Sequence, residues 1–293
     1  RTETKIKQAA TRVIEASNLD YVLAYRCLFG VQQDIICATS SVETGIAMGI
    51  NPYKDWTELV TALWPHNYCF DYTKFDGSLS DMLMSYAGLV MCSLTTEPDL
   101  LANLYAATIW STHHGPRGDY YLEGTNPSGT PFTTMLNCIC NLIIVEYFML
   151  DKGEYLAVTY GDDLILSTKE PVNPLEFQVI LKDEFGMNIT PERKEDTDFR
   201  EVGPMQVSFL KRTPRAVTTS TIVGVLDVDN MVQAIMWCRG ETAFKQQLTS
   251  FILELSLHGP RVYDKIASDF RPLGINLPAF EAAWSEALKV IYD

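Results

Sequence analysis

Residues 160–163, with the sequence Tyr-Gly-Asp-Asp, place two carboxylates side by side between two apolar runs. The flanking runs, residues 155–159 and 164–168, favour β-structure, so we predict a hairpin with its turn at Gly161 and Asp162. Because like charges packed together repel, and burying them uncompensated is costly, such a turn is expected to hold a divalent cation. Carboxylate oxygens are hard ligands that suit magnesium or manganese. On local evidence alone, a solvent-exposed turn explains these residues equally well.

Two further carboxylates, Asp71 and Asp76, lie upstream. Residues 67–73 suit a strand that ends in a bend, which places Asp71 near the end of that strand. Asp76 lies between this strand and a helix predicted at residues 81–94, so helix capping is an alternative to ligand binding at this position.

A dense cluster of turn residues at 123–130 precedes a long apolar helix predicted at residues 132–150. On that helix Thr133 and Asn137 are four residues apart, hence on one face and one turn apart. The pair could contact a ligand, or it could form hydrogen bonds between helices.

The other elements follow from apolar spacing and from turn residues. A domain boundary is placed near residue 226, because the composition turns helical from Asp227 onward. His113 and His114 have no partner at ligand spacing and are expected in a loop or at the surface. Helices are predicted at residues 17–29, 52–63, 97–111, 174–185, 230–238, 243–258, 260–270 and 278–292, and strands at 187–190, 207–212 and 216–223, with a turn at 213–214.

The composition of the 293 residues is that of a packed protein, with 47% hydrophobic residues. The longest apolar segment, residues 135–150, is interrupted by polar residues, so we expect no membrane span. No signal peptide is expected before Arg1. Seven scattered cysteines lack zinc-site spacing and favour a reducing cytosol, with Cys138 and Cys140 as core thiols. A formal net charge of −14 argues against a free-standing nucleic-acid binder.

Together, the motifs resemble those of one family. Asp71-x4-Asp76, then Ser128-Gly129-x3-Thr133-x3-Asn137, then residues 160–163 are similar, in order and separation, to the palm motifs of RNA-dependent RNA polymerases of positive-strand RNA viruses. Residues 71–80 and the Phe-Leu-Lys-Arg sequence at 209–212 look like those of the picornavirus-like group, the latter matching its primer-grip hairpin.

The first residues also resemble part of this family. Residues 11–17 look like the end of its basic fingertip motif, with Arg1 and Lys5 at two other basic positions of that motif. Ala10 departs from a common lysine, and Gly77 from a common alanine. Because family polymerases carry a long fingers segment before this motif, the chain looks cropped and is expected to be inactive in isolation.

The resemblance implies an α+β fold, a right-hand polymerase palm with an antiparallel sheet packed on helices, followed by a helical thumb. Residues 1–66 would be partial fingers and fingertip. Residues 67–226 would form the palm, with a finger-derived insertion around 95–125, and residues 227–293 the thumb.

The resemblance also implies roles for individual residues. Two Mg²⁺ ions, for which Mn²⁺ can substitute, would be held by Asp71, the backbone carbonyl of Tyr72, Asp162 and Asp163. Lys194 resembles the family's general acid toward pyrophosphate. Asp76, Ser128, Gly129, Thr133 and Asn137 would bind the ribose, Arg1, Lys5 and Arg12 the triphosphate, and Lys211 and Arg212 the primer.

The expected partners are an RNA template and primer, ribonucleoside triphosphates, a viral protein primer and other replication proteins. The expected location is the host cytoplasm, at membrane-associated replication complexes. Three alternatives stay open: a reverse transcriptase, a nucleotide cyclase, or a catalytically silent scaffold that binds RNA or replication proteins. The reverse transcriptase is disfavoured because Asp76 and Asn137 offer hydrogen bonds to a 2′-hydroxyl, where reverse transcriptases usually place a bulky aromatic residue.

Overall fold

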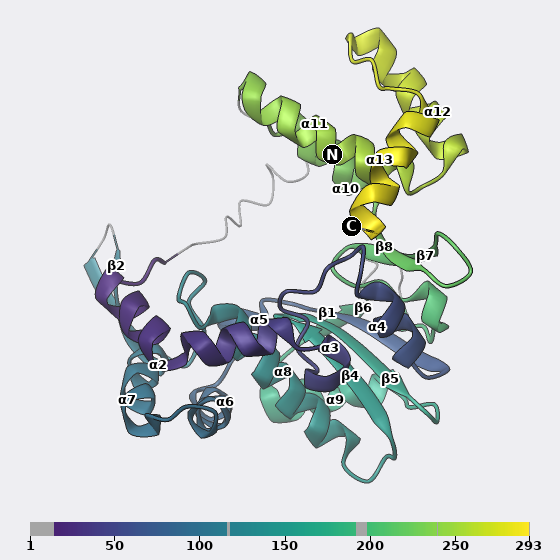
Figure 1. The fold of residues 1–293 in the computed structure, drawn as a ribbon. Helices are drawn as coiled ribbons and strands as arrows, with labels where there is room; N and C mark the ends of the chain where they lie inside the picture. The colour runs from purple at the N-terminus through teal and green to yellow at the C-terminus, as the bar shows by residue number, and fades with distance from the viewer. Residues whose placement is uncertain (1–14, 116–117, 192–197, 239, 293) are drawn as a thin grey trace.

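A computed structural model describes residues 15–115, 118–191, 198–238 and 240–292. Its centre is a four-stranded antiparallel sheet with the strand order β4-β5-β1-β6 (Figure 1). The strands are β1 (His66–Tyr72), β4 (Tyr155–Tyr160), β5 (Asp163–Thr168) and β6 (Ile189–Pro191). The hairpin predicted around Gly161 and Asp162 is confirmed, since β4 and β5 pair from Tyr160 opposite Asp163.

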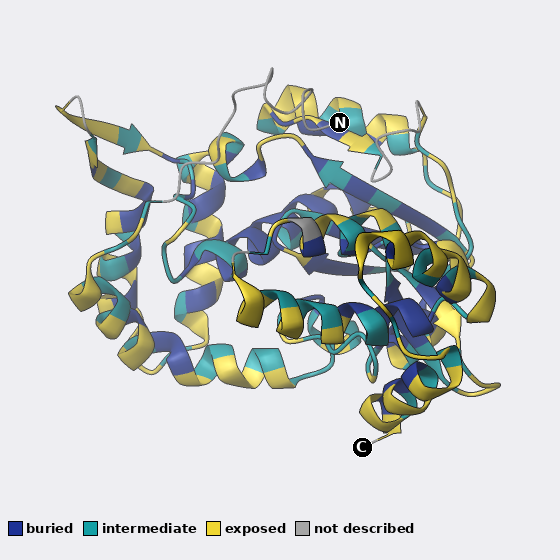
Figure 2. Ribbon diagram, turned by 90° about the horizontal axis from the view of Figure 1, so that it is seen from above, coloured by how far each residue is buried: buried dark blue, intermediate teal, exposed yellow. Residues whose placement is uncertain are grey.

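Both faces of the sheet carry apolar residues, and both are covered. Leu164 and Leu166 of β5 belong to the core formed with the helices α8 (Thr133–Met149), α9 (Pro174–Phe185) and α6 (Asp81–Ser93). Ile165 between them faces a second core, built with α4 (Trp56–Ala62). Figure 2 shows the central strands buried and the outer helices alternating between buried and exposed residues.

Helices α2 (Leu19–Ala38) and α7 (Pro98–Ile109) lie to one side of the sheet, together with the strands β2 (Trp110–Gly115) and β3 (Gly118–Glu123) (Figure 1). Two short helices lie closer to the centre: α3 (Ser41–Thr44) contacts β4, and α5 (Phe75–Ser78) contacts α8. The helix predicted at 97–111 ends earlier than expected, and β2 and β3 form a hairpin that the sequence analysis missed. The expectation for His113 was wrong: it lies on β2, is buried, stacks on Tyr120 and pairs with Glu15.

The C-terminal part begins with a two-stranded hairpin, β7 (Arg212–Ala216) and β8 (Ile222–Leu226). The predicted turn at Thr213 and Pro214 was wrong, because Pro214 lies inside β7 opposite Gly224. Proline is tolerated there because the sheet has only two strands and hence two edges. Gly224 cannot carry a side chain, since a Cβ would lie 2.3 Å from the Trp56 ring.

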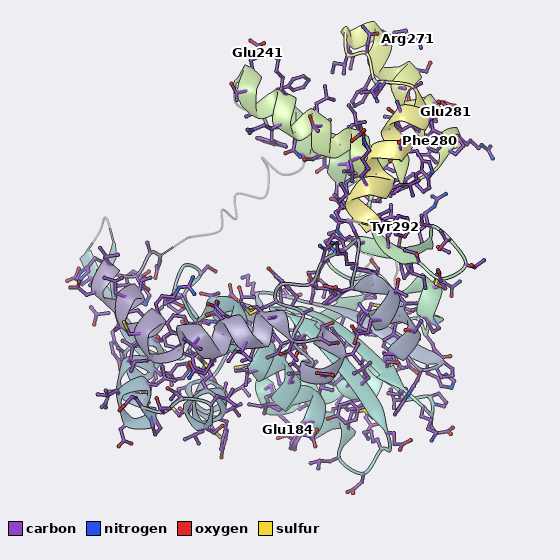
Figure 3. The ribbon with its side chains drawn as sticks, viewed as in Figure 1. Glu184, Glu241, Arg271, Phe280, Glu281 and Tyr292 are labelled. Atoms are coloured by element: carbon purple, nitrogen blue, oxygen red, sulfur yellow. The ribbon has the colours of Figure 1, made fainter. Side chains whose placement is uncertain are left out.

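The remaining helices are α10 (Val228–Met236), α11 (Glu241–Ser256), α12 (Pro260–Phe270) and α13 (Phe280–Tyr292). Two short 3₁₀ turns, Pro204–Gln206 and Arg271–Leu273, complete the described elements. The four helices share their own apolar core and stand away from the sheet. In Figure 3, Glu241 and Arg271 lie at the far tips of this helical part, whereas Tyr292 lies beside the β7–β8 hairpin. These observations confirm the α+β prediction of an antiparallel sheet packed on helices and followed by helices.

Candidate active site

The three predicted carboxylates gather at one end of the central sheet. Phe70 of β1 pairs with Leu164 of β5, so one further step along both strands brings Asp71 beside Asp163. Asp162 lies next to Asp163 in the turn that joins β4 to β5. Gly161 has a φ of 64°, at the first turn position, where a type II′ turn favours glycine. The sheet therefore supplies a set of hard oxygen donors from two adjacent strands, which is the chemistry that Mg²⁺ requires.

No group of three or more acidic, histidine or cysteine side chains stands ready to enclose a metal ion within the part of the chain that the structure describes. The donor set fits a divalent cation by its chemistry and by its strand positions. The metal ligands themselves stay predictions.

The turn at Gly161 and Asp162 is held by side chains of α8. The amide N–H of Gly161 donates to Cys138 Sγ at 3.1 Å, and the Gly161 carbonyl accepts from Asn141 Nδ2 at 3.3 Å. Asn141 Oδ1 in turn accepts from the Tyr72 hydroxyl at 3.0 Å. One buried asparagine thus connects the end of β1 to the β4–β5 turn. Burial raises the pKa of the Cys138 thiol to about 11, so it stays protonated and can donate to the Thr159 carbonyl.

Asn141 was not predicted from the sequence, and Cys138 was predicted only as a core thiol. A signal was present, because Asn141 continues the four-residue spacing of Thr133 and Asn137 along one face of α8. A third polar residue on an otherwise apolar helix indicates a specific hydrogen-bond partner.

A second cluster of polar side chains surrounds Asp76, which lies on α5. Asp76 Oδ1 accepts a short hydrogen bond from Asn137 Nδ2, and Asp76 Oδ2 accepts from Ser128 Oγ at 2.6 Å. Asn137 Oδ1 accepts from Asn126 Nδ2 at 2.8 Å. The structure therefore brings together three of the predicted ribose-binding residues, and adds Asn126, which the sequence analysis left within a turn cluster.

The loop that carries Asn126 is fixed to the segment of Asp76 by backbone hydrogen bonds. The Thr125 amide donates to the Leu79 carbonyl, and the Asn126 amide to the Asp76 carbonyl, both at 2.8 Å. Gly124 makes the close approach possible, with a φ of 72° and no space for a Cβ, which would lie 2.9 Å from the Leu79 carbonyl oxygen.

Thr133 and Gly129 lie beside this cluster and hold its loop in place. The Thr133 hydroxyl donates to the Pro127 carbonyl at 2.8 Å and accepts from the Gly129 amide at 3.4 Å. These contacts fasten the loop to the start of α8. Direct contact of Thr133 and Gly129 with a ribose stays a prediction.

A cavity of about 610 Å³ opens beside Asp71. Its lining also includes Tyr72, Lys74, Gln178 and Thr190. Lys74 was not predicted, since an isolated lysine in a loop gives no signal in sequence; in the structure it is adjacent to the strand end and has a φ of 55°. The cavity has the size of a small-ligand site and carries both signs of charge.

Comparison with known proteins agrees with this geometry. Residues 1–272 match the family described as viral RNA-dependent RNA polymerase. The chain belongs to this family. It is 41% identical to the genome polyprotein of human parechovirus 5 and 37% identical to that of human parechovirus 2, in each case over 99% of this chain and 14% of the polyprotein. Against the Ljunganvirus 1 genome polyprotein the identity is 35%, over the whole chain and 13% of the polyprotein.

The fold of this polymerase-family chain is also shown by a solved structure. The Sicinivirus 3Dpol RNA-dependent RNA polymerase superposes with a TM-score of 0.87 at 23% identity, covering 99% of this chain and 65% of that one. The right-hand polymerase fold and the picornavirus-like resemblance are therefore confirmed. The chain spans about one seventh of the polyproteins it matches. Among the residues that the structure describes, no helix is long and apolar enough to span a membrane.

The two basic residues predicted for the primer have different surroundings in this polymerase-family fold. Lys211 lies in a tight turn with Leu210, where both residues have positive φ, and it is exposed. Arg212 is largely buried and forms a bidentate ion pair with Glu254 of α11, at 2.7 and 3.1 Å, and the Tyr53 hydroxyl also donates to Glu254. Removing one partner of such a pair leaves a buried charge, at a cost of about 3–5 kcal/mol. Arg212 therefore joins the turn at residues 209–212 to α11, and its contact with a primer stays a prediction.

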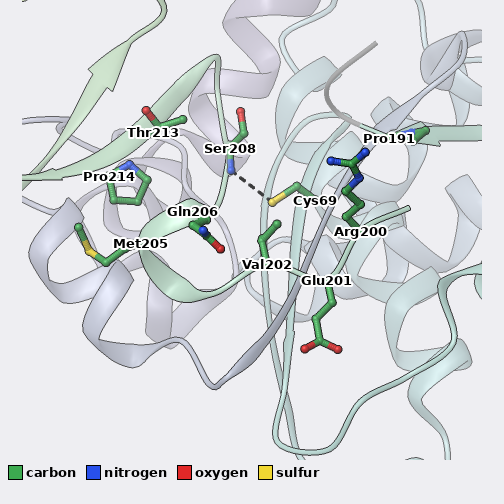
Figure 4. A pocket seen from close by; sticks show the side chains of 10 residues that line it. All are labelled: Cys69, Pro191, Arg200, Glu201, Val202, Met205, Gln206, Ser208, Thr213 and Pro214. Carbon is green, nitrogen blue, oxygen red and sulfur yellow. Dashed lines mark hydrogen bonds between the residues drawn. The ribbon is translucent and has the colours of Figure 1, made fainter. Parts of the chain in front are cut away.

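The segment before this turn rests on the sheet beside a second cavity of about 520 Å³ (Figure 4). The Ser208 amide donates to Cys69 Sγ at 3.4 Å, as the dashed line in Figure 4 marks. Cys69 precedes Asp71 by two residues on β1, so this contact anchors the turn at residues 209–212 close to the carboxylates.

Four predicted site residues lie outside the described residues. They are Arg1, Lys5, Arg12 and Lys194. Their roles toward the triphosphate and pyrophosphate stay predictions.

Proposed function

We propose that the chain provides the palm, the thumb and part of the fingers of a polymerase that copies viral RNA from an RNA template. The proposed parts are residues 1–66 for the fingers, 67–226 for the palm with an insertion around 95–125, and 227–293 for the thumb. The observation that carries the proposal is that Asp71 and Asp163 lie at the same end of two adjacent strands, while Asp76, on the helix that follows β1, forms a hydrogen-bonded cluster with Asn137. Family membership and the fold support the same activity.

The proposed reaction is nucleotidyl transfer to a primer 3′-hydroxyl. Two bound Mg²⁺ ions, or Mn²⁺ in their place, would activate that hydroxyl and stabilise the leaving pyrophosphate. Asp71 and Asp162 would hold both ions, with Asp163 and the Tyr72 carbonyl as further ligands. Lys194 would give a proton to the pyrophosphate, and Arg1, Lys5 and Arg12 would orient the triphosphate. The protein's contribution is mainly positioning and charge stabilisation.

The Asp76 cluster would select ribose. Its oxygens and amide groups are partly or fully buried and hydrogen-bonded to one another, so a 2′-hydroxyl could exchange into these bonds, whereas a deoxyribose could not. Ser128, Gly129 and Thr133 would complete this pocket. The cluster favours RNA synthesis over the reverse-transcriptase alternative, since it offers both a donor and an acceptor to a hydroxyl.

We further propose that RNA template, primer and ribonucleoside triphosphates are the partners, with Lys211 and Arg212 near the primer strand. A viral protein primer, other replication proteins and cytoplasmic, membrane-associated replication complexes belong to the same proposal, supported by the similarity to picornavirus-like polyproteins. The isolated 293-residue chain would bind RNA poorly, because its net charge of −14 repels the phosphate backbone.

The experiment is extension of a primed RNA with ribonucleotides and magnesium by the complete polymerase that carries this sequence. Incorporation that stops on chelation with EDTA and returns with magnesium or manganese is the expected result. Extension with deoxynucleotides in preference to ribonucleotides would favour the reverse transcriptase, and no extension with either would favour the silent scaffold. The isolated chain, assayed beside it, is expected to give no product.

A further inference from the structure

Asn126 is buried behind the Asp76–Asn137 pair, with 2% of its surface exposed. Its amide nitrogen donates in two directions, to Asn137 Oδ1 at 2.8 Å and to the Thr133 carbonyl at 3.0 Å. Its backbone amide donates to the Asp76 carbonyl. Asn126 therefore contacts both members of the pair and lies on a loop that is fixed to both of their elements.

These contacts set the direction of the whole hydrogen-bond chain. A reversed Asn126 amide would point its oxygen at two acceptors, the Thr133 carbonyl and Asn137 Oδ1, which is repulsive. Asn137 must then present its oxygen to Asn126 and its NH₂ group to Asp76. A carboxylate can only accept, so Asp76 is the end of this chain.

The amide oxygen of Asn126 is buried without a hydrogen-bond partner. Such an atom destabilises the fold, and a leucine of the same branched shape would fill the position without it. The NH₂ group of Asn126 nevertheless satisfies two acceptors there, the Thr133 carbonyl and Asn137 Oδ1, and the second of these bonds orients the Asn137 amide.

We propose that Asn126 is a positioning residue for sugar selection, which holds the Asn137 amide from behind while Asp76 exchanges partners with the ribose 2′-hydroxyl. Asp76 alone cannot hold the Asn137 amide in place, because an arriving hydroxyl would disturb the hydrogen bond between Asp76 and Asn137. Asn126 is buried on the opposite side of Asn137 and keeps its hydrogen bond to Asn137 Oδ1 while the sugar binds. The inference rests on the proposed function, since it deepens the role of the same pocket.

The test compares kcat and KM for a ribonucleotide and the matching deoxynucleotide in the complete polymerase. Asn126→Leu removes the donor and keeps the side-chain shape. We expect the ratio of the two kcat/KM values to fall about three- to tenfold, the effect of one hydrogen bond. The loss should come from the ribonucleotide, with the deoxynucleotide parameters nearly unchanged. Asn126→Ala, which removes the donor but leaves a void, should change the ratio in the same direction.

Asn67 provides a matched control. It is fully buried at the other end of β1, donates to the Trp64 and Val202 carbonyls, and likewise has a buried amide oxygen without a partner. Asn67→Leu should affect thermal stability but leave the sugar ratio at the parent value. A background test completes the design: in an Asn137→Ala polymerase, Asn126→Leu should cause no further change in the ratio, because its target is gone.

An unchanged ratio in a folded Asn126→Leu polymerase would overturn the inference, as would an equal fall in Asn67→Leu or an additive effect with Asn137→Ala. These outcomes differ from failure of the proposed function, in which the parent itself would incorporate no nucleotide.

Discussion

The two halves of the proposed active site are held in place by different means. The sugar side is a chain of side-chain hydrogen bonds, from Asn126 through Asn137 to Asp76 and from Ser128 to Asp76. The carboxylate side is placed by strand register and by two bonds from α8 to the backbone of Gly161. In one half the functional side chains position each other, whereas in the other the main chain positions them.

This difference follows from what each half must bind. A pocket that recognises a hydroxyl works best when its donors and acceptors are already oriented, because reorientation on binding would cost free energy. Carboxylates that share a metal ion repel one another before the ion binds, so side-chain contacts among them would be unfavourable. The bonds from α8 to Gly161 instead fix the main chain of the turn that carries Asp162 and Asp163.

The strongest test of the carboxylate half is Asp162→Asn. If the backbone sets the position, this isosteric change should leave the fold intact while it removes a metal ligand. We expect incorporation to fall at least about a thousandfold, since several kcal/mol of charge stabilisation would be lost. Primer extension measures the activity and circular dichroism with thermal melting measures the fold. A structure with the Asp71 and Asp162 oxygens more than about 5 Å apart in the metal-bound state would contradict shared ligation.

The sequence predicted the carboxylate half better than the sugar half, because strands and turns are local features whereas the sugar half depends on tertiary contacts. Alternating or continuous apolar runs specify strands, so Asp71 at a strand end and Asp162 in a turn could be placed without knowing any tertiary contact. Asn126 could not, because its partner Asn137 lies on another element and only the loop path around Gly124 brings the two together. The family resemblance, rather than periodicity, led to Ser128 and Asn137.

Other misses have similar causes. The turn was predicted at Thr213 and Pro214 because these are typical turn residues. In the structure the chain reverses before β7, at Leu210 and Lys211, which both adopt positive φ despite their bulk, and again between Ala216 and Ile222. The burial of His113 depends on Glu15, a contact that local sequence does not reveal.

A second prediction tests whether the hydrogen bonds to the Gly161 backbone set the position of the carboxylates. Asn141→Leu removes the bonds to the Gly161 carbonyl and to the Tyr72 hydroxyl without touching a carboxylate. We expect kcat to fall about ten- to a hundredfold, since a shift of about 1 Å in a reacting group has an effect of this order. KM for the nucleotide should change little. Tyr72→Phe, which loses only the bond between Tyr72 and Asn141, should lower kcat less. An equal fall in kcat in the two variants would mean that the bond to Tyr72 at the end of β1, rather than the bond to Gly161, positions the carboxylates.

A third prediction concerns the sugar half. Asn137→Ala should lower the preference for ribonucleotides about tenfold, because the hydrogen-bond chain to Asp76 is broken. It should relax selection against deoxynucleotides more than it lowers their turnover. Competition between the two nucleotides on one template gives the ratio directly. Unchanged selectivity in both Asn137→Ala and Asp76→Ala would show that the pocket lies elsewhere.

The smallest effect is expected for Ser128→Ala, and it measures how far the sugar half depends on any single bond. Ser128 donates to Asp76 Oδ2, but it is only half-buried, so a water molecule can replace its hydroxyl when the side chain is shortened. Asp76 Oδ1 keeps its bond from Asn137, and the Asp76 carbonyl keeps its bond from the Asn126 amide. We therefore expect the ratio of kcat/KM values to fall only about two- to threefold, less than the net effect of an average buried hydrogen bond. The same competition assay, with Ser167→Ala as a buried serine control on β5, resolves a change of this size. A fall in this ratio as large as that of Asn137→Ala would mean that Ser128 orients Asp76, rather than the hydrogen-bond chain from Asn126 through Asn137.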